Sequence, residues 1–311
     1  NRNFANKVWN ASRFIMMNME DKTITEPSDA DLTATDKWVL SKVNTLAKDV
    51  TENMDKFELG IALQKVYDFI WDEFCDWYIE LAKYRIYHAE EDAVSANAAL
   101  WTLKTVLANG LKLLHPFMPF VSEEIYSALV PEEESLMMSS WPEYKEAWNF
   151  EKEEAIVEHM KEIIRGVRNV RAEMNVAPSR KAKTFVVCEN AELGNGLEAI
   201  KVSAAPLMSA SEVVVQATKE GISEDAVSVV VTDAVVYLPL EDLVDFAQEI
   251  ERLEKEEARL VKELARVNGM LSNEKFISKA PEAKINEEKA KLEKYTQMME
   301  QVKERLEALR K

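Results

Sequence analysis

The sequence predicts a mainly α-helical protein in three parts: a helical bundle, a small α/β element and a C-terminal antiparallel coiled-coil hairpin. Three observations support this fold class. The 311 residues include only seven glycines and nine prolines, so few tight turns can form. Apolar residues recur at helical spacing through residues 1–130 and at heptad spacing after Pro239. Short β-branched runs are confined to the stretch between. We therefore expect domains at residues 1–150, 151–240 and 241–311.

Residues 1–150 are expected to form a bundle of four or five long helices. The helical pattern covers residues 4–19, 38–54, 61–87 and 93–114. The third stretch has more aromatic residues than one amphipathic stripe needs, so we expect it to lie at the centre of the bundle. Pro116 ends the fourth helix, because proline lacks an amide donor and disfavours helical geometry in the residue before it.

The middle part should combine one helix with a small sheet. Helical spacing returns over residues 153–174. Beyond Lys183 the pattern changes to short β-branched runs, which are typical of strands. These runs are residues 184–187, 212–216, 226–231 and 235–238. The last two are separated only by Thr232, Asp233 and Ala234, and we expect a hairpin there.

The last part carries two heptad-like runs. The first contains Leu243, Ile250, Leu253, Leu260, Leu264, Val267 and Leu271, and the second contains Ile285, Leu292, Tyr295, Met299, Val302, Leu306 and Leu309. A ten-residue break between them predicts a hairpin. Glu257 interrupts the first seam, so a short intramolecular hairpin is favoured over an extended dimeric zipper, and we expect a monomer.

The sequence shows no spacing of residues that would support catalysis or metal binding. The three histidines lie on separate predicted elements, and Cys75 and Cys188 are 113 positions apart, so we expect no metal site and no disulfide framework. Only Gly194 and Gly196 lie close together, and we expect them in an asparagine-rich linker rather than in a turn between a strand and a helix, so no phosphate loop is expected. No apolar run is long enough to span a membrane. We therefore expect a cytoplasmic chain with no catalytic residues and no cofactor of its own.

The distribution of charge indicates one basic surface on an acidic protein. The formal net charge is −17, which opposes nonspecific nucleic-acid binding by the whole surface. Residues 161–184 nevertheless carry seven basic side chains and two acidic ones. Helical spacing places four of the basic residues on one face of the predicted helix: Lys161, Arg165, Arg168 and Arg171. This basic ridge either contacts phosphates or is a solvated or internally paired face, and the pattern leaves both open.

A polar stripe on the first helix contains an aromatic residue. Helical spacing places Asn3, Asn6, Lys7, Asn10 and Phe14 within about 100° of arc. An exposed ring can stack on an unpaired base while an asparagine amide reads the edge of the base. The alternative is that Phe14 packs on another helix of the bundle.

Several segments resemble valyl-tRNA synthetases. They are KVWNASRF at residues 7–14, WDEFCDWYIE at 71–80, LHPFMPF at 114–120, IRGVRNVRAEMNV at 164–176 and LSNEKFISKAP at 271–281. The third is shared with isoleucyl and leucyl relatives, whereas the fourth and fifth are the specific ones. The resemblance implies a class I synthetase's anticodon-binding helical bundle, followed by a junction and a coiled-coil tRNA-binding arm.

The resemblance is limited to the C-terminal portion of the family. The ATP-binding signatures, similar to His-Ile-Gly-His and Lys-Met-Ser-Lys-Ser, have no match, and neither does the editing domain. The implied parent is a valine–tRNA ligase that uses ATP, whereas this chain would supply tRNA recognition without aminoacylation chemistry. The implied partners are tRNA(Val) and the catalytic and editing domains of the same parent chain.

The resemblance also implies roles for individual residues. Asn10 and Phe14 match the positions that read and stack on anticodon bases, with Lys7 close by. An opposing acidic residue is implied at Glu73 or Glu80, and the sequence leaves the choice open. The basic ridge and four arm residues would contact the tRNA backbone without reading sequence. The arm residues are Lys255, Arg259, Lys262 and Arg266.

Two alternatives remain at this point. One is the equivalent fragment of an isoleucyl- or leucyl-tRNA synthetase, which would differ in its anticodon preference. The other is a coiled-coil scaffold that binds proteins through residues 241–311 and is indifferent to RNA.

Overall fold

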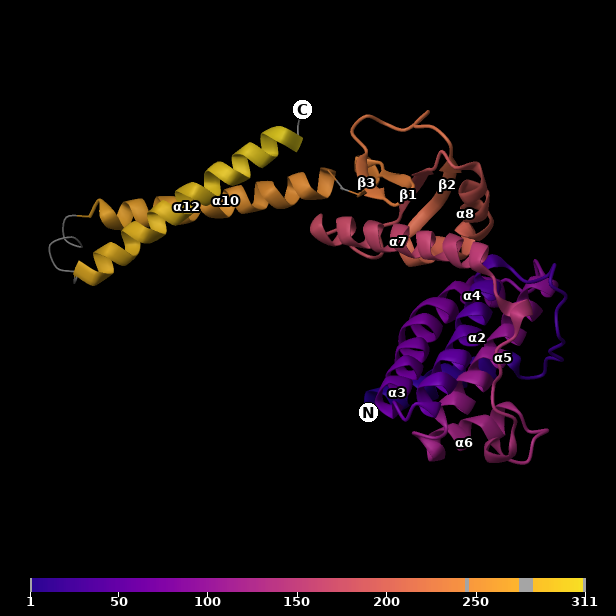
Figure 1. Ribbon diagram of the computed structural model, residues 1–311. Coiled ribbons are helices and arrows are strands. Elements are labelled where there is room, and N and C mark those ends of the chain that lie inside the picture. The colour runs from indigo at the N-terminus through magenta and orange to yellow at the C-terminus, as the bar shows by residue number, and fades with distance from the viewer. Residues whose placement is uncertain (1, 244–245, 274–281, 310–311) are drawn as a thin grey trace. The chain divides into compact units, whose positions relative to one another are not determined.

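The computed structural model describes residues 2–243, 246–273 and 282–309 (Figure 1). It divides into two compact units, residues 1–239 and residues 240–311. The mainly α-helical class with one small sheet is confirmed. Within the described residues, no helix has both the length and the apolar character that crossing a membrane would require. A finer division of the first unit at residue 150 stays a prediction.

The first unit begins with the predicted bundle. Its elements are α1 (Arg2–Met19), α2 (Ala34–Asp55), α3 (Leu59–Asp68), the π-helical segment η1 (Phe69–Tyr78), α4 (Ile79–Tyr87), α5 (Ala93–Leu114) and α6 (Pro119–Leu129). Because α3, η1 and α4 follow one another without a break, they form the single long helix expected from the periodicity. Two short 3₁₀ turns follow, η2 (Leu136–Met138) and η3 (Glu146–Trp148).

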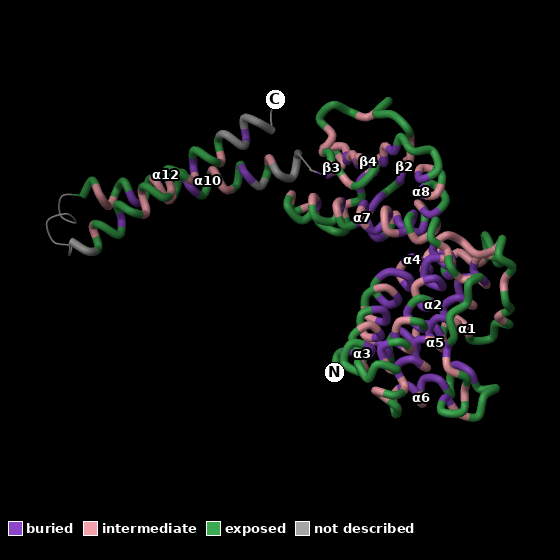
Figure 2. Tube along the Cα trace, in the orientation of Figure 1, coloured by how far each residue is buried: buried purple, intermediate pink, exposed green. Residues whose placement is uncertain are grey.

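The core of the bundle lies between α2, α5 and the π-helical segment (Figure 2). Trp38, Phe74, Tyr78 and Leu103 are among its largest fully buried side chains. Burying each such side chain contributes about 1.5–3 kcal/mol to folding. The central position expected for the aromatic-rich helix is therefore confirmed.

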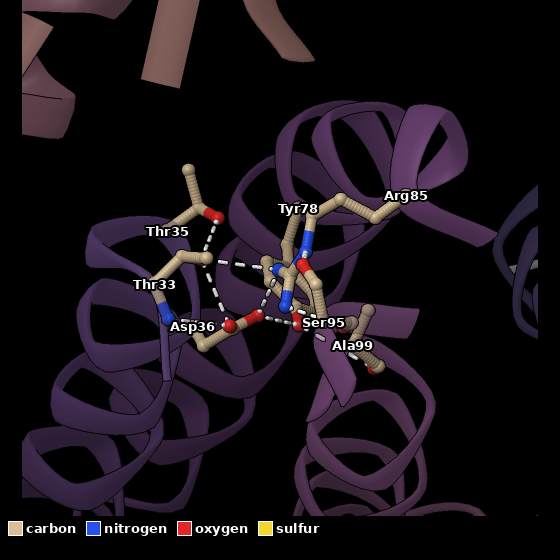
Figure 3. Close-up of polar contacts among 7 residues, drawn as sticks. All are labelled: Thr33, Thr35, Asp36, Tyr78, Arg85, Ser95 and Ala99. Atoms are coloured by element: carbon tan, nitrogen blue, oxygen red, sulfur yellow. Dashed lines mark hydrogen bonds and ion pairs between the residues drawn. The ribbon is translucent and has the colours of Figure 1, made fainter. Parts of the chain in front are cut away.

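A buried ionic network fixes the start of α2 against α4 and α5 (Figure 3). Arg85 Nη1 donates to Asp36 Oδ1 at 2.7 Å, and the Tyr78 hydroxyl donates to the same oxygen at 2.6 Å. The other Asp36 oxygen accepts from the Thr33 amide, and Arg85 also donates to Ser95. Removing one partner of such a buried pair typically costs about 3–5 kcal/mol, so this cluster holds the end of α4 in a fixed place.

The rest of the first unit is an α/β element. Its elements are α7 (Glu151–Glu173), β1 (Ala182–Val187), α8 (Ala191–Ala204), the 3₁₀ turn η4 (Ala205–Met208), β2 (Ala210–Gln216), β3 (Val227–Val231) and β4 (Ala234–Leu238). The strand order is β2-β1-β4-β3. β1 and β2 are parallel and joined through α8, whereas β4 is antiparallel to both β1 and β3.

The predicted hairpin between β3 and β4 is confirmed. Asp233 has φ 58°, in the left-handed region that asparagine and aspartate tolerate better than most residues. α7 packs closely under this hairpin at Gly166, where an added Cβ would lie 2.7 Å from Val229 Cγ1. α7 also packs on α2, so one helix is shared by the bundle and the sheet.

The second unit is the predicted coiled-coil hairpin. It contains α9 (Leu240–Leu243), α10 (Phe246–Leu271) and α12 (Glu282–Leu309), with the two long helices antiparallel and side by side (Figure 1). The buried seam includes Leu253, Leu260, Val267, Met299 and Leu306, all taken from the predicted heptads. Most of the predicted turn, residues 274–281, lies outside the described residues.

Candidate nucleic-acid interface

The polar stripe of α1 lies at the surface. Phe4, Val8 and Ile15 are buried on the opposite side of the helix, whereas Asn3, Asn6 and Asn10 are exposed. Phe14, one turn after Asn10, is half-buried. An amide and a partly accessible ring therefore lie along the same exposed face of the helix.

Phe14 packs against α4 without being covered by it. The Phe14 and Tyr87 rings meet edge to face, with centroids 6.4 Å apart and an angle of 87° between the planes. Tyr87 itself is 63% exposed, and Lys83 Nζ lies 5.7 Å from the centroid of the Phe14 ring. The ring therefore contacts another helix, as the alternative expected, but it stays partly accessible, and base stacking by Phe14 stays a prediction.

The Lys7 side chain is held by two groups of η1. Its Nζ lies 2.7 Å from Asp76 Oδ1 and 3.8 Å from the centroid of the Trp71 ring. Trp71 in turn stacks on Tyr67, with ring centroids 5.7 Å apart. These contacts fix the direction of the ammonium group and partly neutralise it, because the carboxylate is in direct contact.

The two candidate acidic residues occupy different surroundings. Glu73 Oε2 accepts a hydrogen bond from Lys161 of α7, on the side of η1 that faces the α/β element. Glu80 is paired with Lys83 at 2.6 Å, and Lys83 is the residue that lies over Phe14. Of these two residues, Glu80 therefore lies on the side of Phe14, whereas Asp76 is the carboxylate that contacts Lys7 of α1.

The basic ridge of α7 is exposed only in part. Arg165 and Arg168 are exposed, with their guanidinium carbons 5.1 Å and 5.9 Å from the Trp77 ring centroid. Arg168 Nε also donates to the Leu207 carbonyl at 2.8 Å. Lys161 and Arg171 are instead 1% and 6% exposed, so for these two the structure favours internal pairing, one of the alternatives that the sequence left open, over contact with phosphates.

The physical reason is that α7 has two buried sides. Lys161 Nζ reaches across to the bundle, where it lies 2.7 Å from Glu73 and 3.0 Å from Glu158. Burial acts to raise the pKa of Glu158, but Lys161, the Trp38 indole N–H and Lys42 outweigh it and lower that pKa below its usual value. Arg171 donates to the carbonyls of Ala177 and Arg180 in the loop before β1.

The four arm cations all lie at the surface of α10. Lys255, Arg259 and Arg266 each pair with a glutamate three or four residues earlier in the same helix. Among the described residues, no carboxylate pairs with Lys262. Exposed pairs of this kind contribute little to stability, so the cations can exchange a carboxylate for a phosphate at small cost.

Sequence reasoning missed Tyr87 and Lys83. Both lie in the predicted third helix, but neither belongs to the α1 stripe, and nothing in the periodicity pairs the end of that helix with Phe14. The contact depends on how α1 crosses α4, which the fold determines.

Comparison with known proteins gives two family matches. Residues 36–186 match the family described as the anticodon-binding domain of tRNA ligase, and residues 245–310 match the family described as the valyl tRNA synthetase tRNA binding arm. Together the two matches cover the bundle from α2 onward, α7, most of β1 and the arm, whereas α1 lies outside both.

The chain is also similar to curated valine–tRNA ligases. It is 51% identical over 313 aligned residues to that of Clostridium perfringens, 49% identical over 313 to that of Clostridium tetani and 46% identical over 310 to that of Clostridium acetobutylicum. Each alignment covers 99% of this chain and 35% of the relative, so the chain spans about a third of the length of these relatives.

Proposed function

The chain belongs to the valyl-tRNA synthetase family, of which it carries the anticodon-binding domain and the tRNA-binding arm, and from this premise we propose that it positions tRNA(Val) on a valine–tRNA ligase. The ATP-dependent attachment of valine would belong to catalytic and editing domains of the parent chain. This chain would contribute specificity and orientation and no chemical step. The isoleucyl, leucyl and scaffold alternatives are not favoured, because the arm family and the relatives above are all of the valine type.

The observation that carries the proposal is the grouping of Asn10, Phe14 and Tyr87. An anticodon base would stack on the accessible part of the Phe14 ring, and the Asn10 amide, which can both donate and accept, would read its edge. Tyr87 would form a second wall of the site and restrict the orientation of the Phe14 ring. Lys83 and Glu80 would supply a cation and an acceptor at its border.

Backbone contacts would be made by residues that read no sequence. On α7 these are Arg165 and Arg168, which remain exposed and have their guanidinium planes near Trp77. On the arm they are Lys255, Arg259, Lys262 and Arg266, along the outer corner of the tRNA. Residues 241–311 carry 15 basic and 17 acidic side chains, so the arm lacks the strong negative charge of the rest and suits a contact with RNA.

The proposal places the chain in the cytoplasm as a monomer. Its test is a titration of the chain against a tRNA(Val) transcript and against one with the central anticodon base changed, each at low and moderate salt. Tighter binding of the unchanged transcript supports anticodon reading. Equal binding of both transcripts would leave only the arm and Arg165 and Arg168 as RNA contacts, and no binding would contradict the proposal for this chain.

A further inference from the structure

A row of apolar residues runs along one side of α3 and the start of η1, at intervals of four residues. The row consists of Leu59, Leu63, Tyr67 and Trp71. Phe4 of α1 stacks on the last two, with its ring centroid 4.5 Å from that of Tyr67 and 6.5 Å from that of Trp71. Leu59 and Leu63 are 50% and 37% exposed. α1 therefore covers only the later part of an apolar row.

The direction of α1 indicates what would lie next along this row. Phe4 meets Tyr67 near one end of α1 and Phe14 meets Tyr87 near the other, so α1 runs parallel to α3, η1 and α4. The start of α1 lies beside α3 (Figure 1). A chain that continued α1 backwards would pass the two exposed leucines, about 6 Å and 12 Å before Tyr67 at 1.5 Å per residue.

The turn before α3 adds an exposed aromatic ring near the same end of the bundle. Phe57 is 88% exposed, and its φ of 60° lies in the left-handed region. Backbone hydrogen bonds close the turn, from the Phe57 amide to the Met54 carbonyl and from the Glu58 amide to the Asn53 carbonyl. Glycine would form the same bonds and adopt this conformation more readily. The turn therefore does not account for the ring, which makes little contact within this chain.

We propose that Phe57, Leu59 and Leu63 form a docking surface for the segment of the parent chain that directly precedes residue 1. The inference rests on the proposed function, under which the catalytic and editing domains belong to the same chain. Because this chain corresponds to the C-terminal part of the valine–tRNA ligases above, about two thirds of such a parent would precede it. The segment that leads into α1 would pack its own apolar side chains on the exposed end of the row and exclude water from it.

Other occupants suit this surface less well. Residues 52–58 carry three carboxylates and one ammonium group, and their net negative charge opposes the phosphates of RNA. Lys65, further along α3, already pairs with Asp49 at 2.8 Å. A second copy of this chain would have to lose its translational freedom on binding, whereas the preceding segment is held beside the row by its covalent link to α1.

The first experiment places a cross-linking group in the full-length parent ligase. The photoreactive residue p-benzoylphenylalanine replaces Phe57, which keeps an aromatic ring at an exposed position. After irradiation, peptide mass spectrometry should show an intramolecular cross-link from position 57 to the stretch of about ten residues before residue 1, the length of helix that reaches the end of the row. The same replacement of Tyr87, which is 63% exposed at the end of α4, is the control and should not label that stretch.

The cross-linked peptide identifies the occupant. A cross-link from position 57 to a second copy, to the arm or to added tRNA(Val) would overturn the proposal. The absence of any cross-link to the stretch before residue 1 would also overturn it.

The second experiment compares hydroxyl-radical oxidation of this chain and of the parent ligase. We expect oxidation of Phe57 and Leu63 to be severalfold lower in the parent. In the parent, Leu59→Asp should return that oxidation toward the level of this chain, because a carboxylate in an apolar contact is costly. Val94→Asp is the matched control, since Val94 also lies in the first turn of a helix and is 57% exposed. Equal oxidation of Phe57 and Leu63 in this chain and in the parent would contradict the docking surface.

The docking surface and the proposed anticodon reading can fail separately. Neither docking experiment depends on RNA binding, and anticodon reading is measured with tRNA transcripts that differ only in the anticodon. Equal binding of those transcripts, together with the expected cross-link, would support the docking surface and contradict anticodon reading.

Discussion

The ring of Phe14 stands edge-on to the ring of Tyr87, with their centroids 6.4 Å apart. Phe14 belongs to α1 and Tyr87 to the last turn of α4, whose position is fixed by the buried Arg85–Asp36 pair two residues earlier in the helix. Edge-to-face packing is a favoured aromatic geometry. The ring proposed to stack on the anticodon is thus held in place before RNA arrives, which reduces the entropy lost on binding.

Replacing Tyr87 tests whether this restraint contributes to RNA binding. We expect Tyr87→Ala to weaken binding of tRNA(Val) by about 1 kcal/mol, the usual contribution of one aromatic pair, and Tyr87→Phe to leave it unchanged. Phe120→Ala is the control, because Phe120 is 91% exposed on α6. If titration shows that Tyr87→Ala binds tRNA(Val) as tightly as Phe120→Ala does, Tyr87 has no role in binding.

Charge removal on α7 tests the proposed phosphate contacts. Arg165→Gln should weaken binding to transcripts with either anticodon equally and reduce the slope of log affinity against log salt by about 0.7–0.9, because one fewer phosphate is neutralised. Arg168→Gln should do the same and also lower the thermal midpoint, since it loses the hydrogen bond to the Leu207 carbonyl. An unchanged salt slope for Arg165→Gln would show that its guanidinium meets no phosphate.

Lys161 is expected to behave as a structural residue. Lys161→Met removes the buried cation between Glu73 and Glu158, of which Glu158 keeps Lys42 at 3.6 Å, and should destabilise the chain by about 1–3 kcal/mol in urea unfolding. This is less than for a fully buried pair, because both carboxylates keep partial contact with water. Arg165→Met should cost less than about 0.5 kcal/mol, as surface substitutions usually do. Similar free energies of unfolding for the two variants would contradict the buried pairing.

The lowered pKa of Glu158 predicts acid sensitivity of the same cluster. A carboxylate whose pKa is depressed in the folded state stabilises the fold above its unfolded pKa of about 4.3, and that stability is lost as the pH falls through the folded pKa. The unchanged chain should therefore exceed Glu158→Gln in unfolding free energy near neutral pH. Urea titrations should show the difference shrinking below about pH 4. If the difference in unfolding free energy between the unchanged chain and Glu158→Gln does not vary with pH, the ionisation of Glu158 does not contribute to stability.

Much of the fold follows from spacing in the sequence. The helical periods placed the bundle helices, and the heptads placed the buried seam of the arm at Leu253, Leu260 and Val267. The first two strands begin two residues before the predicted runs, at Ala182 and Ala210, because alanine carries no strand signal. Their pairing with neighbouring strands extends them.

The candidate site was predictable where it lies on one helix. Asn10 and Phe14 share a face of α1 through helical geometry alone. For Lys161 the sequence left phosphate contact and internal pairing both open, because a helical projection does not show that α7 is buried against both the bundle and the α/β element. Tyr87 was missed because its contact with Phe14 joins residues 73 positions apart in the sequence.

The central claim is that Phe14 stacks on an anticodon base. The most direct test compares the unchanged chain with Phe14→Ala on intact tRNA(Val) and on three transcripts, each abasic at one anticodon position. We predict that Phe14→Ala weakens binding of intact tRNA by about 1–3 kcal/mol and has no effect on one of the abasic transcripts, where the same stacking contact is already missing. An equal loss on all four RNAs, or no loss on intact tRNA, would contradict the account.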